Sequence, residues 1–147
     1  MKKLLIIIGV AVTAIVAYWL ISPLFITKRV DEPLEKVAAK SAVETISQGT
    51  FAGLAGHNGR GMAKLLKIDG KNYIRFEDDF RVTNGPDLFV HFGKDNQYAA
   101  SARIGELKGN EGGQNYEVPS AIDPKQYNEV WIWCRSFSVP FAKAVLK

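Results

Sequence analysis

The sequence predicts an all-β domain, an antiparallel β-sandwich or small barrel of about seven or more short strands, preceded by one transmembrane helix and a short stalk helix. Three observations predict this architecture. A long uncharged stretch opens the chain, a charged stretch follows it, and from Gly49 onward short apolar or alternating runs are separated by Gly, Asn, Asp and Pro. Runs of this kind are typical of antiparallel strands joined by turns. We therefore divide the chain into an anchor (1–27), a stalk or linker (28–48) and a β domain (49–147).

The composition is that of a folded protein without a strong affinity for nucleic acid. Hydrophobic residues make up 47% of the chain and charged residues 23%, which provides enough apolar material for a packed core. The net charge of +4 is divided evenly, because residues 1–48 and residues 49–147 each carry +2. So small an excess of basic residues gives the β domain little attraction for phosphates, and no nucleic-acid partner is predicted.

The uncharged stretch begins at Leu4 and ends at Ile26. A helix of this length crosses a hydrocarbon core of roughly 30 Å, so the membrane bilayer is its predicted partner. A cleaved signal peptide is the alternative, but its apolar stretch is usually only about 7–15 residues long and ends at a small-residue cleavage site. Basic residues flank both ends, Lys2 and Lys3 before the stretch and Lys28 and Arg29 after it, so charge does not fix the orientation.

The stalk begins with a helix-start signal, in which Asp31 and Glu32 precede Pro33. A short helix is therefore expected here. The apolar stripe that follows is narrow and includes alanine and serine. Such a weak stripe favours an exposed spacer over a helix that packs on a core.

The β domain contains seven stretches with strand patterning. Turn signals containing Gly, Asn or Asp separate most of them. Many short strands with regular turns are typical of sandwiches and small barrels. The predicted strands cover residues 50–54, 63–68, 72–76, 88–92, 115–118, 129–134 and 139–146.

The sixth predicted strand contains the single cysteine of the chain. Val130, Ile132 and Cys134 should point to one side of this strand, and Trp131 and Trp133 to the other, because side chains alternate along a strand. Both sides are mostly apolar, which indicates a central strand. Cys134 stands where the sequence turns polar, so we expect its sulfur near a surface opening.

Four segments of the β domain carry a resemblance to a known family. "GTF" and "GHNGRG" lie at 49–51 and 56–61, and "FRVTNGPDLFVHF" lies at 80–92. "LKGNEGGQNYEVP" lies at 107–119, and "YNEVWIWCRSFSVPFAKAVL" at 127–146. Together these segments resemble the DM-thirteen domain, the electron-transfer domain associated with Skeletor-type proteins.

The most specific element of the resemblance is a Trp-Cys-x-x-Phe motif, matched by Trp133, Cys134 and Phe137. A His-x-x-x-Gly motif is matched by His57 and Gly61. A Gly-Pro-Asp-Leu motif is matched at 85–88, and a glycine that often follows the last phenylalanine of the family is replaced here by alanine.

The resemblance implies an extracytoplasmic domain with an electron-transfer role. In this reading Cys134 acts as a bare thiol or holds a prosthetic group such as haem. A redox partner protein, such as a cytochrome or a haem-binding domain, is implied as well. The resemblance implies no particular enzymatic reaction or substrate.

The residues alone leave the role of Cys134 open. A lone free cysteine on a central strand is commonly a buried, inert small hydrophobe. One cysteine cannot hold an iron–sulfur cluster or close an intramolecular disulfide, and without C-x-x-C-H there is no c-type haem attachment. A reactive thiol, an intermolecular disulfide and thiolate ligation of non-covalent haem remain as functional alternatives.

Two histidines are available as a second ligand or a base. His57 lies in a glycine-rich loop, where a nearby imidazolium would favour the thiolate form of Cys134. We therefore take Cys134, His57 and Trp133 as the candidate cofactor-binding residues. His91 alternates with Phe89 on one strand and is expected to be structural. The acidic run at 77–79 is interpreted as a solvated corner, and no metal site is predicted.

Two functions follow from these observations. The first is a membrane-tethered, extracytoplasmic electron-transfer or thiol-redox module that uses Cys134. The alternative is a non-catalytic β-sandwich that binds a partner at the membrane surface, with Cys134 filling the core.

Overall fold

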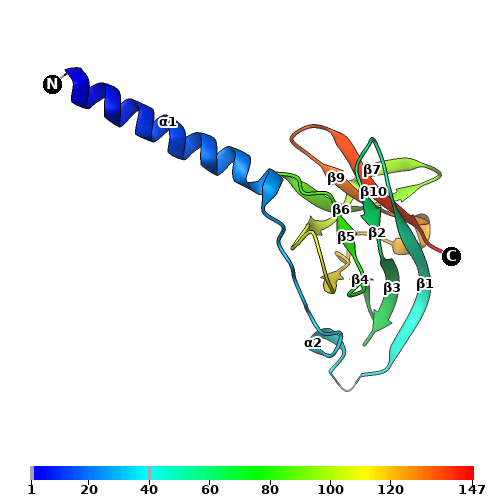
Figure 1. Ribbon diagram of the computed structural model, residues 1–147. Helices are drawn as coiled ribbons and strands as arrows, with labels where there is room; N and C mark the ends of the chain where they lie inside the picture. The colour runs from blue at the N-terminus through cyan, green and yellow to red at the C-terminus, as the bar shows by residue number, and fades with distance from the viewer. Residues whose placement is uncertain (1, 40) are drawn as a thin grey trace.

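The computed structural model describes residues 2–39 and 41–147. A long helix, α1 (Lys2–Phe25), projects from a β domain, as Figure 1 shows. Most of its described side chains are exposed, for example Leu5 at 67% and Trp19 at 77%. In the described part of the chain, α1 is the one helix long and apolar enough to cross a membrane. The apolar N-terminal helix of the prediction is therefore present, and near its end Ser22 lines a cleft together with Gly85 of the β domain.

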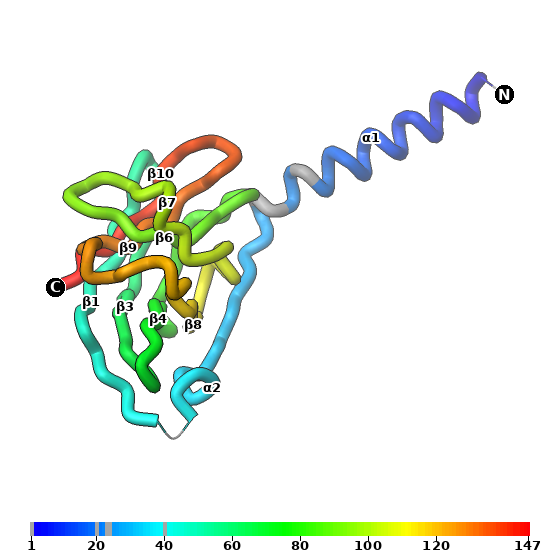
Figure 2. The backbone as a smooth tube through the Cα atoms, turned by 180° about the vertical axis from the view of Figure 1, so that it is seen from behind, coloured from blue at the N-terminus to red at the C-terminus, as the bar shows by residue number. Residues whose placement is uncertain are grey.

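The β domain is built on one curled antiparallel sheet of eight strands, in the order β7-β6-β9-β10-β1-β3-β4-β8. Figure 2 shows the chain of these strands curling around a common interior, like half of a barrel. The predicted fold class, a mostly antiparallel β structure, is confirmed. The bounds of the eight strands are β1 (Val43–Gly53), β3 (Met62–Ile68), β4 (Lys71–Phe76), β6 (Leu88–Lys94), β7 (Gln97–Glu106), β8 (Gln114–Glu117), β9 (Glu129–Cys134) and β10 (Val139–Val145).

Strand β1 joins the two halves of the curled sheet. Its first part, from Val43 to Thr50, pairs with β3, and its last part, from Phe51 to Gly53, pairs with β10. The backbones of β1 and β10 come very close at Gly49. A Cβ at this position would lie 2.1 Å from the carbonyl oxygen of Val145 in β10. Glycine is therefore required where β1 passes from one neighbour to the other.

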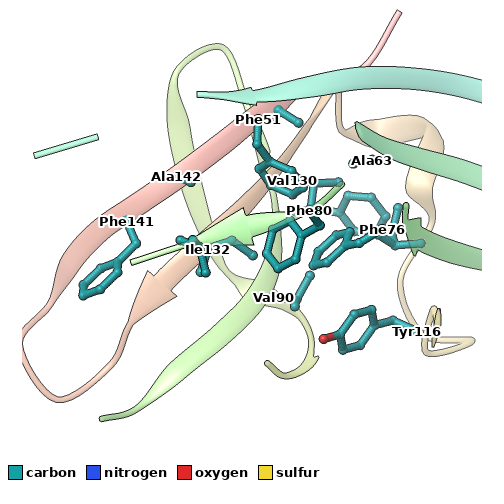
Figure 3. Packing of buried hydrophobic residues seen from close by; sticks show 14 of the residues in the cluster. Phe51, Ala63, Phe76, Phe80, Val90, Tyr116, Val130, Ile132, Phe141 and Ala142 are labelled. Carbon is teal, nitrogen blue, oxygen red and sulfur yellow. The ribbon is translucent and has the colours of Figure 1, made fainter. Parts of the chain in front are cut away.

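Aromatic rings fill the interior where β1 changes partner, as Figure 3 shows. The Phe51 ring meets the Phe76 ring edge to face at 5.0 Å between centroids, and it lies 5.1 Å from the Phe80 ring. Phe76 and Phe80 are themselves 4.5 Å apart. Edge-to-face and tilted pairs at these separations are favourable arrangements for aromatic rings. These three buried rings therefore hold both halves of the sheet to one core.

The sequence identified the buried strands but missed the edge. Each of the seven predicted strands is present, and β9 has the predicted bounds. The missed strand β7 is the edge strand beside β6, and its residues QYAASARIGE are mostly exposed or partly exposed. Its inward side chains are small or only partly buried, such as Ala102 and Ile104, so its apolar alternation is weak and pairing with β6 does much to define it. The strands β2 (Gly59–Arg60) and β5 (Arg81–Val82) pair with each other and were also missed, because two residues are too few to show an alternating pattern.

The expectation that the linker is an exposed spacer is wrong, because its first part lies along the β domain and its last residues, 43–48, belong to strand β1. The backbone N–H of Val30 donates to the carbonyl of Glu111 at 2.9 Å, and that of Glu32 donates to the carbonyl of Gly113 at 2.8 Å. The short helix α2 (Glu35–Ala38) follows, and Ala38 packs with Leu66, Ile68 and Tyr73. Backbone pairing attaches this segment, so its weak apolar stripe gave no signal.

The carboxylate of Glu32 is the main polar attachment of the linker. It accepts hydrogen bonds from the ammonium groups of Lys108 at 2.8 Å and Lys36 at 3.0 Å, and from the backbone N–H of Asn115 at 2.9 Å. Burial alone would raise the pKa of this carboxyl, but these three donors outweigh burial and lower its pKa to about 2. The ionised form therefore holds the linker on the domain.

We expect Glu32→Gln to lower the free energy of unfolding of the full chain at pH 7 by about 1–3 kcal/mol, because a charged acceptor is lost. The folded pKa of Glu32 lies below its unfolded value, so its contribution is present above pH of about 4.5 and is lost as pH falls toward about 2. Urea unfolding of wild type and variant across this pH range should therefore show the two curves converging in acid. The exposed carboxylate of Glu35 gives the matched control, and Glu35→Gln should change stability by less than about 0.5 kcal/mol. A difference that stays constant down to pH of about 2 would contradict the assigned role.

Candidate functional site

Cys134 lies in the core and not at a surface opening. It is the last residue of β9, where it pairs with Leu88 of β6 on one side and Val139 of β10 on the other. Its exposed fraction is 0%. The expectation of an accessible sulfur is therefore wrong. Strand alternation keeps Cys134 on the inner face, and the polar residues after it form the turn beyond the strand, so they do not open the core.

Trp133 lies on the opposite face of the sheet from Cys134. Its indole stacks on the Tyr98 ring of β7, with centroids 4.2 Å apart and planes within 6°. The His91 ring meets Tyr98 at 4.6 Å. We call this surface the outer aromatic face, and it consists of Phe89, His91, Tyr98, Trp131 and Trp133. Cys134 and Trp133 therefore do not line one common pocket.

Cations surround the outer aromatic face. The guanidinium carbons of Arg103 and Arg135 lie 5.3 and 4.7 Å from the centroid of the Phe89 ring. Such cation–π contacts are favourable and leave the charges partly in water. A shallow cleft of about 350 Å³ lies between them and is also lined by His91 and Tyr98.

His91 is buried in this face, as expected of a structural residue. Its Nδ1 lies 3.4 Å from the carbonyl oxygen of Ala99. Burial lowers the pKa of His91 to about 4, more than the carbonyl contact raises it, so the imidazole is neutral at physiological pH. It can therefore accept or donate a hydrogen bond without a change of charge.

Glu129 is a buried acid that sequence reasoning missed. Its carboxylate accepts from the Trp131 indole N–H at 2.9 Å and pairs with the Lys143 ammonium at 2.8 Å. Burial raises the pKa of Glu129, but these donors outweigh it and lower the pKa overall. A lone acid that opens an otherwise apolar strand was the available signal. The Glu129 carboxylate fixes the Trp131 ring at the start of β9.

His57 lies at a third location, in the loop after β1. Its ring stacks on the Phe141 ring with centroids 3.6 Å apart and planes within 10°. It lines a cleft of about 830 Å³ together with Arg60, Arg81 and Thr83. Among the described residues no hydrogen bond joins His57 to Cys134. The three predicted cofactor-binding residues, Cys134, His57 and Trp133, are thus distributed over the core, a cleft and the outer face.

Two of the motifs that carried the family resemblance meet in space. The Asp87 carboxylate of the Gly-Pro-Asp-Leu motif accepts from Ser136 Oγ at 2.7 Å and from Arg135 Nε at 3.0 Å. The Ser136 hydroxyl and the Arg135 guanidinium lower the pKa of Asp87, so the carboxylate stays ionised. Gly85 lies against the core, where a Cβ would come within 2.9 Å of Leu88 and Phe141 side-chain atoms. Asp87 therefore braces the turn after β9.

The acidic run at 77–79 is engaged in structural contacts. Glu77 pairs with Lys64 at 2.7 Å, Asp78 pairs with Arg75 at 3.1 Å, and Asp79 accepts from the backbone N–H of Met62 at 3.1 Å. Within residues 2–39 and 41–147, no group of three His, Cys, Asp or Glu side chains is arranged to hold a metal ion.

A haem does not fit at Cys134. Axial ligation requires the iron to reach the sulfur, and the ring around the iron then needs open space beside it. Cys134 has no exposed surface and lies between the paired strands β6 and β10. The core would have to open before a prosthetic group could reach the thiol.

The fold and its motifs define an all-β domain carried on an apolar N-terminal helix. Residues 50–146 match the family model described as "Electron transfer DM13". The match covers more than half of the chain, and the chain therefore belongs to the DM13 family. A search of curated proteins and a search of solved structures each gave no match.

We expect the Cys134 thiol of the folded full chain to react with a disulfide reagent far more slowly than an exposed thiol, because exchange needs an accessible thiolate. Colour release from Ellman's reagent, before and after denaturation, measures this. The control carries Cys134→Ser and Ser120→Cys, which places a single thiol at an exposed turn residue. Equal native rates in the two proteins would contradict the buried placement, as would a haem absorbance band that Cys134→Ser removes.

Proposed function

We propose that this chain is a membrane-tethered, extracytoplasmic electron-transfer module. The observation that carries the proposal is the DM13 match over residues 50–146, which supports a role in electron transfer. The exposed, apolar helix α1 supports the tether, because its 24 residues are long enough to cross a bilayer. Lys2 and Lys3 then lie in the cytoplasm, and residues 28–147 lie outside.

We expect protease added to intact cells to digest the β domain, because the proposed orientation places it outside the cytoplasm. Immunoblotting against a C-terminal epitope tag measures the loss. A cytoplasmic protein, which should stay intact until lysis, controls for leakage. Digestion of the β domain only after lysis would overturn the orientation.

Within this proposal Cys134 is the redox residue, and it acts without contact with a partner. Complete burial is unfavourable for direct attack by the thiol on a partner disulfide and for haem ligation. One-electron transfer has a less strict requirement, since an electron can cross a short distance through protein to an oxidised haem of the partner. The Cys134 thiol would then also release its proton, to water at the end of β9, and become a thiyl radical that a later electron and proton restore. Trp133, the next residue back along β9, brings an indole stacked on Tyr98 to the outer face. The outer aromatic face is thus the proposed point of exchange with a redox partner such as a cytochrome.

A second function, a non-catalytic binding module, is favoured by one observation. Cys134 packs among the residues of the main core, including Val90 and Ile132, which are also 0% exposed. A thiol in such surroundings is commonly a small hydrophobe, and burial in apolar surroundings makes it inert. In this alternative the clefts beside His57 and on the outer face bind a partner, and no electron passes.

The two functions differ in the electrochemistry of the full chain. We expect voltammetry of the chain in a supported bilayer to give a redox signal that Cys134→Ser removes, because serine cannot be reversibly oxidised. Circular dichroism of the variant should show an intact β domain, and Ser120→Ala, a change at an exposed site, should keep the signal. A Cys134→Ser protein that keeps the full signal would exclude Cys134 as the redox residue. A wild-type chain without any signal would favour the binding module.

A further inference from the structure

Phe137 is the exception among the phenylalanines of the β domain. Its exposed fraction is 64%, whereas Phe51, Phe76, Phe80, Phe89, Phe92 and Phe141 are all between 0% and 8% exposed. It lies at the tip of the connection between β9 and β10. The folded domain leaves nearly two-thirds of this large apolar side chain uncovered. Single exposed apolar residues are common on protein surfaces, so the position of Phe137 relative to α1 decides what it can contact.

The connection that carries Phe137 is held in one position. Asp87 accepts hydrogen bonds from the side chains of both Arg135 and Ser136. The backbone N–H of Arg135 also donates to the carbonyl of Asp87 at 3.0 Å. The turn is therefore fixed to the 85–88 segment, and Phe137 projects from a supported base.

The 85–88 segment in turn lies against the end of α1. A cleft of about 320 Å³ is lined both by Ser22 and Ile26, at the end of the helix, and by Gly85 and Pro86. Next to it, the Thr27 hydroxyl lies 3.2 Å from the amide nitrogen of Asn84, which donates to it. Figures 1 and 2 both show the β9–β10 connection on the side of the domain where α1 arrives. The turn that carries Phe137 is thus linked by contacts to the point where the chain leaves the helix.

We propose that Phe137 inserts into the interfacial layer of the bilayer that α1 spans, as a second membrane contact of the chain. The inference rests on the proposed tether. The uncharged part of the helix ends at Ile26, so the polar headgroup layer, roughly 5–8 Å thick on each side, begins at the level of this cleft. Phenylalanine is among the apolar side chains that interfacial membrane segments bury at the boundary between headgroups and acyl chains.

The charges beside Phe137 fit a lipid surface. Arg135 is two residues away, and although Asp87 binds it at 3.0 and 3.1 Å, its side chain is 65% exposed, which leaves the free edge of the guanidinium open to headgroup phosphates. A long basic side chain beside an inserted ring is a common arrangement at membrane interfaces. With α1 and Phe137 both attached, the β domain cannot rotate freely about the linker, so the bilayer sets which of its faces is presented to partners.

Photo-cross-linking of the full chain in lipid nanodiscs tests this inference. The photoreactive residue p-benzoylphenylalanine replaces Phe137 in one variant, Trp19 in a second and Lys125 in a third. Trp19 lies in α1 and reports the tether itself. Lys125 is an exposed residue before β9, and the length of β9, about 20 Å, separates its end of the strand from the turn. Mass spectrometry after irradiation identifies what each position has bound.

We expect lipid adducts at positions 137 and 19 and no lipid adduct at position 125. An adduct at 19 without one at 137 would overturn the inference and leave the tether intact. Absence of lipid at both 19 and 137 would overturn the tether together with the inference. Adducts at all three positions, or a protein–protein adduct at 137 in place of lipid, would also overturn it, the latter in favour of a protein contact.

Discussion

The passage of β1 from β3 to β10 is the constraint on which the rest of the β domain depends. A single strand that pairs with both halves of the sheet forces the sheet to curl, and the curl creates an interior. Gly49 permits the close approach to β10, and Phe51 enters the interior just beyond it, against Phe76 and Phe80. The end of β1 also positions the loop that carries His57. A bulkier residue at Gly49 would therefore disturb the pairing, the core and the cleft beside His57 together.

The alternation of side chains along β9 separates the chemistry of the domain into two compartments. Cys134 belongs to the inner face, where apolar side chains cover it, and Trp133 belongs to the outer face, where it stacks on Tyr98. Trp133 and Cys134, which are adjacent in one motif, therefore lie in different environments. This separation explains why a motif that reads as one redox site in the sequence does not form one pocket in the fold. It also places the aromatic face, and not the thiol, where a partner protein can make contact.

Contacts between distant segments join the motifs into one end of the domain. Asp87 connects the Gly-Pro-Asp-Leu segment to the turn after β9, and the same segment meets the end of α1. Glu32 attaches the linker to Lys108 and Asn115, so the helix and the domain are not joined by a free tether. Ionised carboxylates make both connections. Charge-assisted polar contacts therefore help to hold the linker and the turn after β9 in place.

The sequence by itself determined the apolar helix, the antiparallel β class and the buried strands, because each depends on a local pattern of apolar residues. The pattern in β9 even assigned Val130, Ile132 and Cys134 to one face. Only the tertiary structure decided the edge strand β7, the docked linker and the burial of Cys134. Pairing with β6 determines β7, and backbone bonds to residues 111–113 hold the linker, so neither needs an apolar signature of its own. Cys134 is buried because β6 and β10 lie on either side of it. Strand β6 is distant in the chain and β10 follows a turn, so no local spacing of residues predicts that they enclose the cysteine.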